Sequence, residues 1–352
     1  MRLALLVVVA FALRNVVAIP PSWDQLDESY TFERYVEDFA KSYSKDEWDQ
    51  RKDIFGRNLV RILAHNRQRK TGHVLGVNQF MDFKPEEVPT GHDKRYQRAR
   101  AVSLDRSSRT PHSIDLPFEI DDVATLPSDV DWRRAGIVTP VKDQGMCGSC
   151  WAFASTAALE SHIAQETGFL FSLSVQELVS CSPNTRECGG QGGCLGSTAE
   201  LAYDFVASEG MVEEWRFGYA SYNGEKVACS LLDRNLRGVD GSVVTIDGYA
   251  VTPLNDYVAV MNAVAKYGPV VVNVAAHEWS LYAGGVFHSM SNKPSSYDIN
   301  HDVVLVGYGT DEATGEDYWL IRNSWSPQWG KPNSHSIVHE ALSTSHNCVS
   351  SR

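Results

Sequence analysis

The sequence has no hydrophobic run long enough to cross a membrane. Its longest apolar stretch, residues 3–13, follows Arg2 and is succeeded by small residues up to Ala18. A basic residue, a short apolar segment and small residues in this order are typical of a secretory signal peptide. We therefore expect residues 1–18 to be removed in the secretory pathway, and the remaining protein to be soluble and without a membrane partner.

Positive charge is also scarce, and Asn-X-Ser/Thr sites and internal repeats are absent. Lys and Arg number 32 against 44 Asp and Glu, which gives a formal net charge of −12. A nucleic-acid partner requires a basic surface, so we expect none. One group of His and Cys near the C-terminus lacks the surroundings of a metal site, so we predict neither metal nor cofactor. That group is His335, His339, His346 and Cys348.

Cysteine is present in an odd number, seven, so at least one thiol is left over after pairing. Cys150 is the candidate nucleophile. Glycine and serine precede it and the Ala-rich segment 151–160 follows, which predicts a helix that begins here. The free N–H groups and the positive end of a helix lower the pKa of a thiol. Gln144 can donate a side-chain hydrogen bond to an oxyanion at the same helix end.

Residues 144–153, Gln-Gly-Met-Cys-Gly-Ser-Cys-Trp-Ala-Phe, resemble the active-site signature of papain-like cysteine proteases, the cathepsin L group in particular. The resemblance implies a histidine as base and an asparagine that orients it. His301 begins an apolar run that ends in Gly-Tyr-Gly, which predicts a buried strand, and Asn323 follows a second apolar segment. The implied catalytic residues are Cys150, His301 and Asn323, with Trp325 shielding the His–Asn hydrogen bond from water.

Upstream, six residues recur at intervals of three or four and share one face of a predicted long helix. Two are asparagines, which a core face tolerates only when each is hydrogen-bonded. Glu47 and Arg51 are one turn apart and are expected to pair. With the following segment, 76–82, they resemble the two propeptide motifs of cathepsin L-like zymogens, including the ERFNIN type. The motif residues are Glu47, Arg51, Phe55, Asn58, Ile62, Asn66, Gly76, Asn78, Phe80 and Asp82.

The resemblance implies that residues 19–125 form an inhibitory propeptide, which packs on the catalytic domain and runs through its cleft. The Arg- and Ser-rich segment 95–113 predicts an exposed, cleavable linker, and the mature protein is expected to begin near Leu126. If carboxylates such as that of Asp82 hold the propeptide, acid would release it.

The rest of the chain changes from helix-like to Val-rich composition. We expect an α+β, papain-like two-lobed fold, with a helical lobe, a β-barrel-like lobe and a preceding helical prodomain. The catalytic site is expected between the lobes. A chain of 352 residues that is 43% hydrophobic is long enough for these units. Helix-like content covers 151–181 and 198–210, strands are predicted at 243–251, 269–276 and 303–308, and the peptidase domain spans 126–352.

The resemblance also implies which residues bind substrate. Ser197 stands where relatives have a glycine that pairs with the substrate backbone two residues before the scissile bond. Thr198, Asn273 and Ile299 make the neighbouring pocket more polar than usual, which leaves a preference for a bulky apolar residue open. The implied set is Gly196, Ser197, Thr198, Asn273, Ile299, Trp325 and Trp329. The implied disulfides are Cys147–Cys194 and Cys181–Cys229, with Cys188 and Cys348 as an open pair.

The last segment, 331–352, departs from the family pattern. It is rich in Ser, His and Asn, so we expect that it cannot supply the buried side chains of a closing strand. The overall prediction is a monomeric cysteine endopeptidase zymogen, lysosomal, vacuolar or extracellular, that acts on proteins and peptides and is inhibited by its own propeptide. Two alternatives stay open: a catalytically incompetent splice or frame variant that acts as an inhibitor or binding protein, and an exopeptidase of the same family.

Overall fold

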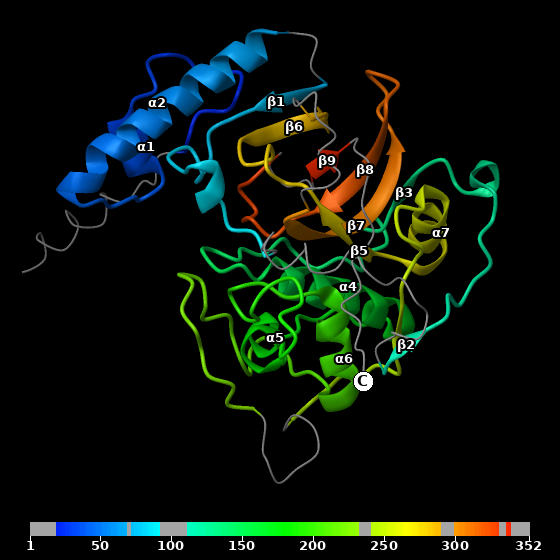
Figure 1. The fold of residues 1–352 in the computed structure, drawn as a ribbon. Coiled ribbons are helices and arrows are strands. Elements are labelled where there is room, and N and C mark those ends of the chain that lie inside the picture. Colours follow the sequence, from blue (N-terminus) through cyan, green and yellow to red (C-terminus); the bar gives the residue numbers. More distant parts are fainter. Residues whose placement is uncertain are drawn as a thin grey trace, which may run out of the picture.

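The computed structural model describes residues 19–68, 72–91, 111–231, 241–289, 299–330 and 336–338. Figure 1 shows three parts: a helical prodomain, a sheet beside it, and a group of helices on the far side of the sheet. The predicted signal peptide and most of the predicted linker lie outside the described residues. Within the part of the chain that the structure describes, no helix combines the length and apolarity needed to cross a membrane.

The prodomain is built on two helices, α1 (Phe32–Asp38) and α2 (Lys45–Arg67). A capping box at Ser44 satisfies backbone N–H groups that the start of α2 would otherwise leave without partners. The predicted face of α2 is buried, since Phe55 is 3% exposed and Ile62 is fully buried. Both side chains pack with α1 in one hydrophobic cluster, so the prodomain has a core of its own.

The helical lobe contains α4 (Cys150–Thr167), α5 (Val175–Cys181) and α6 (Ala199–Glu209). The helix-like composition over 151–181 therefore resolves into two helices. The first ends because Gly168 adopts a left-handed conformation, φ 77°, which closes the last turn. Helix α4 is buried along most of its length and packs on both α6 and the sheet.

Seven strands within the described residues form one sheet in the order β1-β6-β9-β8-β7-β3, with β5 paired to β7. Strand β1 comes from the prodomain and pairs antiparallel with β6, so the prodomain extends the sheet of the β lobe. The strands are β1 (His73–Leu75), β3 (Val130–Asp131), β5 (Val270–Val274), β6 (Tyr282–Phe287), β7 (His301–Thr310), β8 (Asp317–Arg322) and β9 (Ser336–Val338).

Two elements differ from expectation in the segment that links the lobes. The predicted strand at 243–251 is reduced to β4 (Tyr249–Ala250), which pairs in parallel with β2 (Ser113–Ile114). Helix α7 (Tyr257–Tyr267), which the sequence did not predict, begins where Asp256 caps its first turn. The short 3-10 turns are η1 (Pro85–Glu87) and η4 (Val123–Thr125).

The C-terminal segment 331–352 contributes one strand to the sheet. Strand β9 pairs antiparallel with β8 and parallel with β6, so three residues of the 331–352 segment join the sheet. This pairing uses backbone N–H and C=O groups, which polar residues carry as well as apolar ones, so the expectation about buried side chains stays a prediction. The rest of the tail lies outside the described residues. The α+β class, with two lobes and a helical prodomain, is as predicted.

Candidate active site

Cys150 is the first residue of α4 and is fully buried. Its Sγ accepts a hydrogen bond from the backbone N–H of Asp302, 3.3 Å away, which joins the helical lobe to the start of β7. Burial, and after it the negative charge of Asp302, raise the pKa of this thiol well above its ordinary value. The lowered pKa expected from the helix end is therefore wrong for this covered state, because lost hydration outweighs the helix.

His301 is the first residue of β7, and Asn323 directly follows β8. Nε2 of His301 lies 2.7 Å from Oδ1 of Asn323, a hydrogen bond that fixes the orientation of the imidazole. The indole of Trp325 stacks on this ring, with centroids 4.7 Å apart, and is fully buried. The indole therefore keeps water from the hydrogen bond, which strengthens it.

The amide of Gln144 is buried and held at both of its polar atoms. Oε1 accepts a hydrogen bond of 2.6 Å from the hydroxyl of Ser324. Nε2 donates to the carbonyl oxygen of Cys147 at 2.9 Å and to that of Pro89, in the prodomain, at 3.4 Å. A prodomain carbonyl thus already uses this amide as a donor, the role that an oxyanion would require of it.

The backbone of the prodomain crosses over Cys150. A Cβ at Gly91 would lie only 2.4 Å from Cys150 Sγ, and the N–H of Gly91 donates to the carbonyl oxygen of Asn300 at 3.2 Å. On the other side, a Cβ at Gly196 would lie 2.3 Å from the carbonyl oxygen of Gly91. The prodomain therefore fills the groove between the lobes, and only glycine fits above the thiol. Sequence reasoning missed Gly91, which offers no side-chain signal.

Polar residues of the prodomain motifs hold the crossing segment in place. Asn58 donates to a backbone carbonyl at 2.9 Å, and Asn66 both donates to and accepts from the backbone of Leu75. Both asparagines on the buried face are thus hydrogen-bonded, as expected. Asn78 reaches the β lobe, where its Nδ2 donates to the carbonyl oxygen of Ser280 at 2.7 Å.

Asp82 accepts three hydrogen bonds inside the prodomain. Its carboxylate is 1% exposed and receives the hydroxyls of Tyr35 and Tyr43 and the ammonium of Lys41. Burial, followed by the Asp82 charge, raises the pKa of Tyr35, so that this phenol remains a donor. The carboxylate ties the end of the motif segment to the α1 region.

Arg51 forms its ion pair with Glu87, at 2.6 Å, rather than with Glu47 as expected. The same guanidinium nitrogen donates to the carbonyl oxygen of Asp82 at 2.9 Å. Glu47 instead accepts hydrogen bonds from Ser44 at the start of α2. Tertiary contacts with the crossing segment thus replace the local pair that helical spacing favours.

Trp325 and Trp329 are both expected to contact substrate; in this structure Trp325 contacts the prodomain, and Trp329 packs on Trp325. Their rings lie edge to face with centroids 5.1 Å apart, and Phe80 packs on Trp325 at 5.4 Å. Gln79 donates from Nε2 to the backbone carbonyl of Trp325 at 2.6 Å. Phe80 therefore anchors the prodomain in the hydrophobic core of the β lobe.

The other expected substrate-binding residues are buried in this structure. Ser197 and Thr198 are 1% and 2% exposed, and Asn273 and Ile299 are each 6% exposed. Nδ2 of Asn273 donates to the carboxylate of Asp302. Sequence reasoning missed Asp302, although an acid within an apolar strand is a visible signal of a special role.

Both disulfides implied by the resemblance are present in the helical lobe, and Cys150 is the free cysteine among the described residues. Cys188 is disulfide-bonded as well, while its candidate partner, Cys348, lies outside the described residues. In the described ranges, no group of three His, Cys, Asp or Glu side chains is placed to hold a metal ion. The two described bridges are Cys147–Cys194 and Cys181–Cys229.

Comparison with known proteins assigns the chain to a family. Residues 126–348 match the papain family cysteine proteases, and residues 32–88 match the cathepsin propeptide inhibitor domain. This chain therefore belongs to the papain family of cysteine proteases and carries the inhibitor domain found in cathepsin propeptides.

Relatives and solved structures agree with this assignment. The oryzain beta chain of Oryza sativa subsp. japonica is 38% identical over 290 residues, 81% of this chain but only 56% of that protein. Cathepsin L of Sarcophaga peregrina is 34% identical over 332 residues, 92% of each chain. A recombinant stem bromelain precursor superposes with a TM-score of 0.71 at 30% identity, over 89% of this chain and 92% of that one.

A digestive procathepsin L2 from Tenebrio molitor larval midgut gives the same TM-score, 0.71, and 30% identity, over 89% of this chain and 97% of that one. The papain-like fold expected from the sequence is thereby confirmed. This chain spans little more than half the length of the first rice relatives it matches, 56% and 54%.

Proposed function

We propose that this chain is a cathepsin L-like cysteine endopeptidase, made as an inactive precursor, which hydrolyses peptide bonds in proteins and peptides. One arrangement carries the proposal. A thiol at a helix start lies against the strand that begins with His301, His301 is hydrogen-bonded to Asn323, and a peptide backbone lies across Cys150. A groove that already holds a peptide chain beside a nucleophile fits peptide hydrolysis.

The proposed reaction begins when His301 takes the proton of the Cys150 thiol and the thiolate attacks the carbonyl carbon of the substrate. Nε2 of Gln144 and the backbone N–H of Cys150 stabilise the oxyanion. As the C–N bond breaks, the imidazolium returns its proton to the leaving amine. Water, deprotonated by His301, then attacks the acyl-enzyme and releases the carboxylic acid and the thiol, while Asn323 keeps the ring oriented.

The prodomain prevents this reaction in the precursor. It fills the groove with backbone at Gly91 and removes water from Cys150, and this burial raises the pKa of the thiol. Its departure would rehydrate the thiol and let the helix end and the imidazolium stabilise the thiolate. We propose that acid promotes this departure, with the buried carboxylate of Asp82 as one trigger. An Asp82→Asn precursor that activates at an unchanged pH would count against that trigger.

The domain boundaries and the cellular compartment of the protein are part of the same proposal. Residues 1–18 would direct the chain into the secretory pathway, residues 19–125 would be the removable propeptide, and residues 126–352 the monomeric peptidase. The family matches, which begin at 32 and at 126, support the division. The final compartment would be a lysosome, a vacuole or the extracellular space.

The test is intact-mass spectrometry of the precursor without residues 1–18, before and after acidification, in the presence of a peptidyl epoxide that alkylates nucleophilic thiols. We expect a single label, mapped by digestion to Cys150, together with loss of the residues up to about 125. A Cys150→Ser precursor, which lacks the thiol and should take up no label, is the matched control. A soluble precursor that takes up no label at acid pH would refute the proposed activity.

A further inference from the structure

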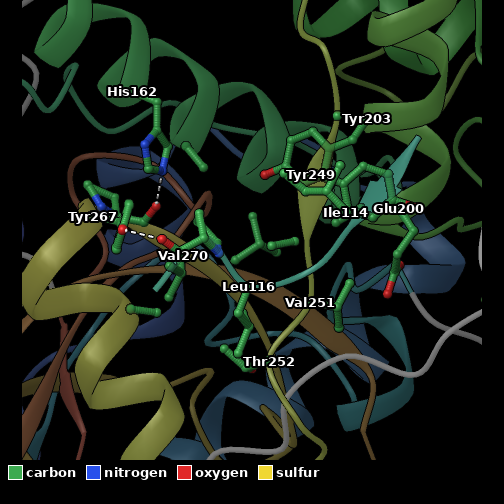
Figure 2. Close-up of a pocket in the computed structure, with 18 of the residues that line it drawn as sticks. Ile114, Leu116, His162, Glu200, Tyr203, Tyr249, Val251, Thr252, Tyr267 and Val270 are labelled. Carbon is green, nitrogen blue, oxygen red and sulfur yellow. Dashed lines mark hydrogen bonds between the residues drawn. The ribbon is translucent and has the colours of Figure 1, made fainter. Parts of the chain in front are cut away.

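A cavity of about 320 Å³ lies between the lobes, close to the candidate active site. Helices α4, α6 and α7 and strand β5 provide its walls, and prodomain residues 114–118 close one side. Most of the lining side chains are apolar, among them those of Leu116, Val251 and Val272. Figure 2 shows Glu200, Tyr203 and Tyr249 at one end and His162, Tyr267 and Val270 at the other.

One end of this cavity is rich in hydrogen-bond acceptors. Asn273 and Glu200 line it and are 6% and 5% exposed. The Nδ2 of Asn273 donates to Asp302, whereas its Oδ1 has no hydrogen-bond partner among the described residues. The buried hydroxyl oxygen of Thr198, adjacent to the cavity-lining Ala199, also has none there. Buried acceptors without donors are unfavourable, so this end fits a ligand that supplies donors.

The acceptor-rich end is connected to the nucleophile by direct contacts. Asp302 donates its backbone N–H to Cys150 Sγ, and it lies opposite Asn273 in the pairing of β7 with β5. The peptide backbone in the groove passes against Gly196, three residues before the cavity-lining Ala199. A substrate in the same groove would therefore have a side chain within reach of this end.

The charge at this end is negative. Burial is the main reason why the pKa of Cys150 is raised, and the charge of the Asp302 carboxylate raises it further. Burial likewise raises the pKa of Tyr203, and the charges of Glu200 and Asp302 add to that increase. An apolar substrate side chain would supply no hydrogen-bond donor to Oδ1 of Asn273. A Lys or Arg side chain has hydrogen-bond donors and no acceptors, and it carries a positive charge. Its aliphatic stem can pack on the apolar wall of the cavity.

We propose that this end of the cavity selects a Lys or Arg side chain of the substrate, two residues before the scissile bond, with Asp302, Asn273 and Glu200 as its partners. Asp302 is then a specificity-determining residue as well as a neighbour of the nucleophile. The inference rests on the proposed function, and it replaces the apolar preference left open by the sequence with a basic one.

Two peptidyl epoxides, identical except for Arg or norleucine at that position, test the inference on the acid-activated enzyme. Norleucine is the matched comparison because it keeps an aliphatic stem and lacks the guanidinium. We expect the Arg epoxide to label Cys150 at least about tenfold faster, the gain of one desolvated charged hydrogen bond. The corresponding fluorogenic peptides should show the same ratio in kcat/KM.

Asp302→Asn should bring the Arg-to-norleucine ratio close to one, whatever it does to the absolute rates, because it keeps the size of the side chain and removes its charge. Glu312→Gln, at an exposed acid away from the cavity, should leave the ratio unchanged. Faster labelling by norleucine, or a ratio unaffected by Asp302→Asn, would overturn the inference while leaving the protease intact. Failure of both epoxides to label Cys150 would overturn the proposed function together with it.

Discussion

The two lobes are stabilised in different ways. Among the described residues, two disulfides link parts of the helical lobe to each other, Cys147–Cys194 and Cys181–Cys229, and Cys188 is disulfide-bonded in addition. The sheet of the β lobe instead takes strand β1 from the prodomain and β9 from the tail, and its hydrophobic core includes Phe80 of the prodomain. Figure 1 shows the prodomain lying along the β1–β6 side of the sheet. One lobe is therefore cross-linked covalently, whereas the sheet of the other is completed by the noncovalent pairing of a prodomain strand and a tail strand.

This difference assigns separate tasks to the lobes. Because of its disulfides, we expect the lobe that carries Cys150 to keep one conformation with or without the prodomain. We expect the lobe that carries His301 to lose the contacts of β1 and Phe80 when the prodomain leaves, so that release can be regulated there without disturbing the nucleophile. Substitutions in the two lobes should accordingly change different measurable quantities.

The largest expected effect comes from the disulfides. Replacing both cysteines of Cys147–Cys194 by serine should lower the free energy of unfolding by about 4 kcal/mol, because a loop of this length gains that much entropy in the unfolded chain. Denaturant unfolding of Cys150→Ser precursors measures this. The bridge also flanks the site, since Cys147 and Gly148 lie just before Cys150. In the activated enzyme, kcat/KM should therefore fall at least about tenfold even where the protein is folded.

Cys181–Cys229 is a matched control, because the two bridges span nearly the same sequence separation, 48 against 47 residues. Its replacement by serines should cost a similar free energy of unfolding and leave kcat/KM within about threefold. Equal losses of kcat/KM from the two double substitutions would show that neither bridge positions the nucleophile.

Phe80→Ala tests the reversible attachment of the β lobe. Phe80 is 4% exposed and packs on Trp325, so its truncation should weaken prodomain docking by about 3 kcal/mol, a factor of roughly 100. Hydrogen exchange reports docking at the amides of Gly76 and Val286, which donate across the β1–β6 junction. Phe169→Ala, at a 74% exposed phenyl of the helical lobe, should change nothing. Unaltered exchange in Phe80→Ala would mean that the strand pairing alone holds the prodomain.

The same junction should respond to pH through a histidine cluster. His73 of β1 is 2% exposed, and its ring centroid lies 4.6 Å from that of His65. His288 of the β lobe donates its backbone N–H to Nδ1 of His73 and contacts Glu316 through its own ring. Burial, followed by the charges of His65 and His288, lowers the pKa of His73 to about 4.

Because the pKa of His73 is lower in the docked state, docking is strongest when this histidine is neutral. The stabilisation is fully present above the ordinary pKa of 6.5 and is lost as the pH falls toward 4. At pH 5 the loss should be at most about 2 kcal/mol, or roughly 30-fold in docking, because the charge of His65 acts within the prodomain itself. Exchange at Gly76 and Val286, corrected for intrinsic rates, should show it in the Cys150→Ser precursor.

His73→Gln should remove most of this pH dependence. His162→Gln is the control, because His162 lies on α4 and its ring is hydrogen-bonded to the carbonyl oxygen of Pro269 rather than to β1. A pH profile that stays the same in His73→Gln would assign acid release to carboxylates such as Asp82 instead.

Sequence reasoning succeeded where one residue type has few physical roles. The spacing of Phe55, Asn58 and Ile62 defined a helix face, and a polar residue on that face required a partner. It failed where the tertiary structure determines which residues come into contact. Arg51 forms its ion pair with Glu87 from a later segment, and Gly91 lies over Cys150. Spacing along a helix predicts local neighbours, but not which loop the tertiary structure brings against them. Asp302 was missed for a related reason, since its meaning depends on Asn273 of another strand.

The smallest expected effect comes from Asn66, which joins α2 to β1 through hydrogen bonds with both backbone groups of Leu75. Asn66→Ala should weaken docking by about 1 kcal/mol, or roughly fivefold in exchange at Gly76, because water replaces part of what the amide supplied. Asn66→Asp separates the two bonds: it retains the acceptor for the Leu75 N–H and loses the donor to its carbonyl. If Asp behaves like Ala, the donor bond dominates, and β1 is positioned mainly through its carbonyl groups. An effect as large as that of Phe80→Ala would instead mean that the register of β1, rather than the burial of Phe80, governs attachment to the β lobe.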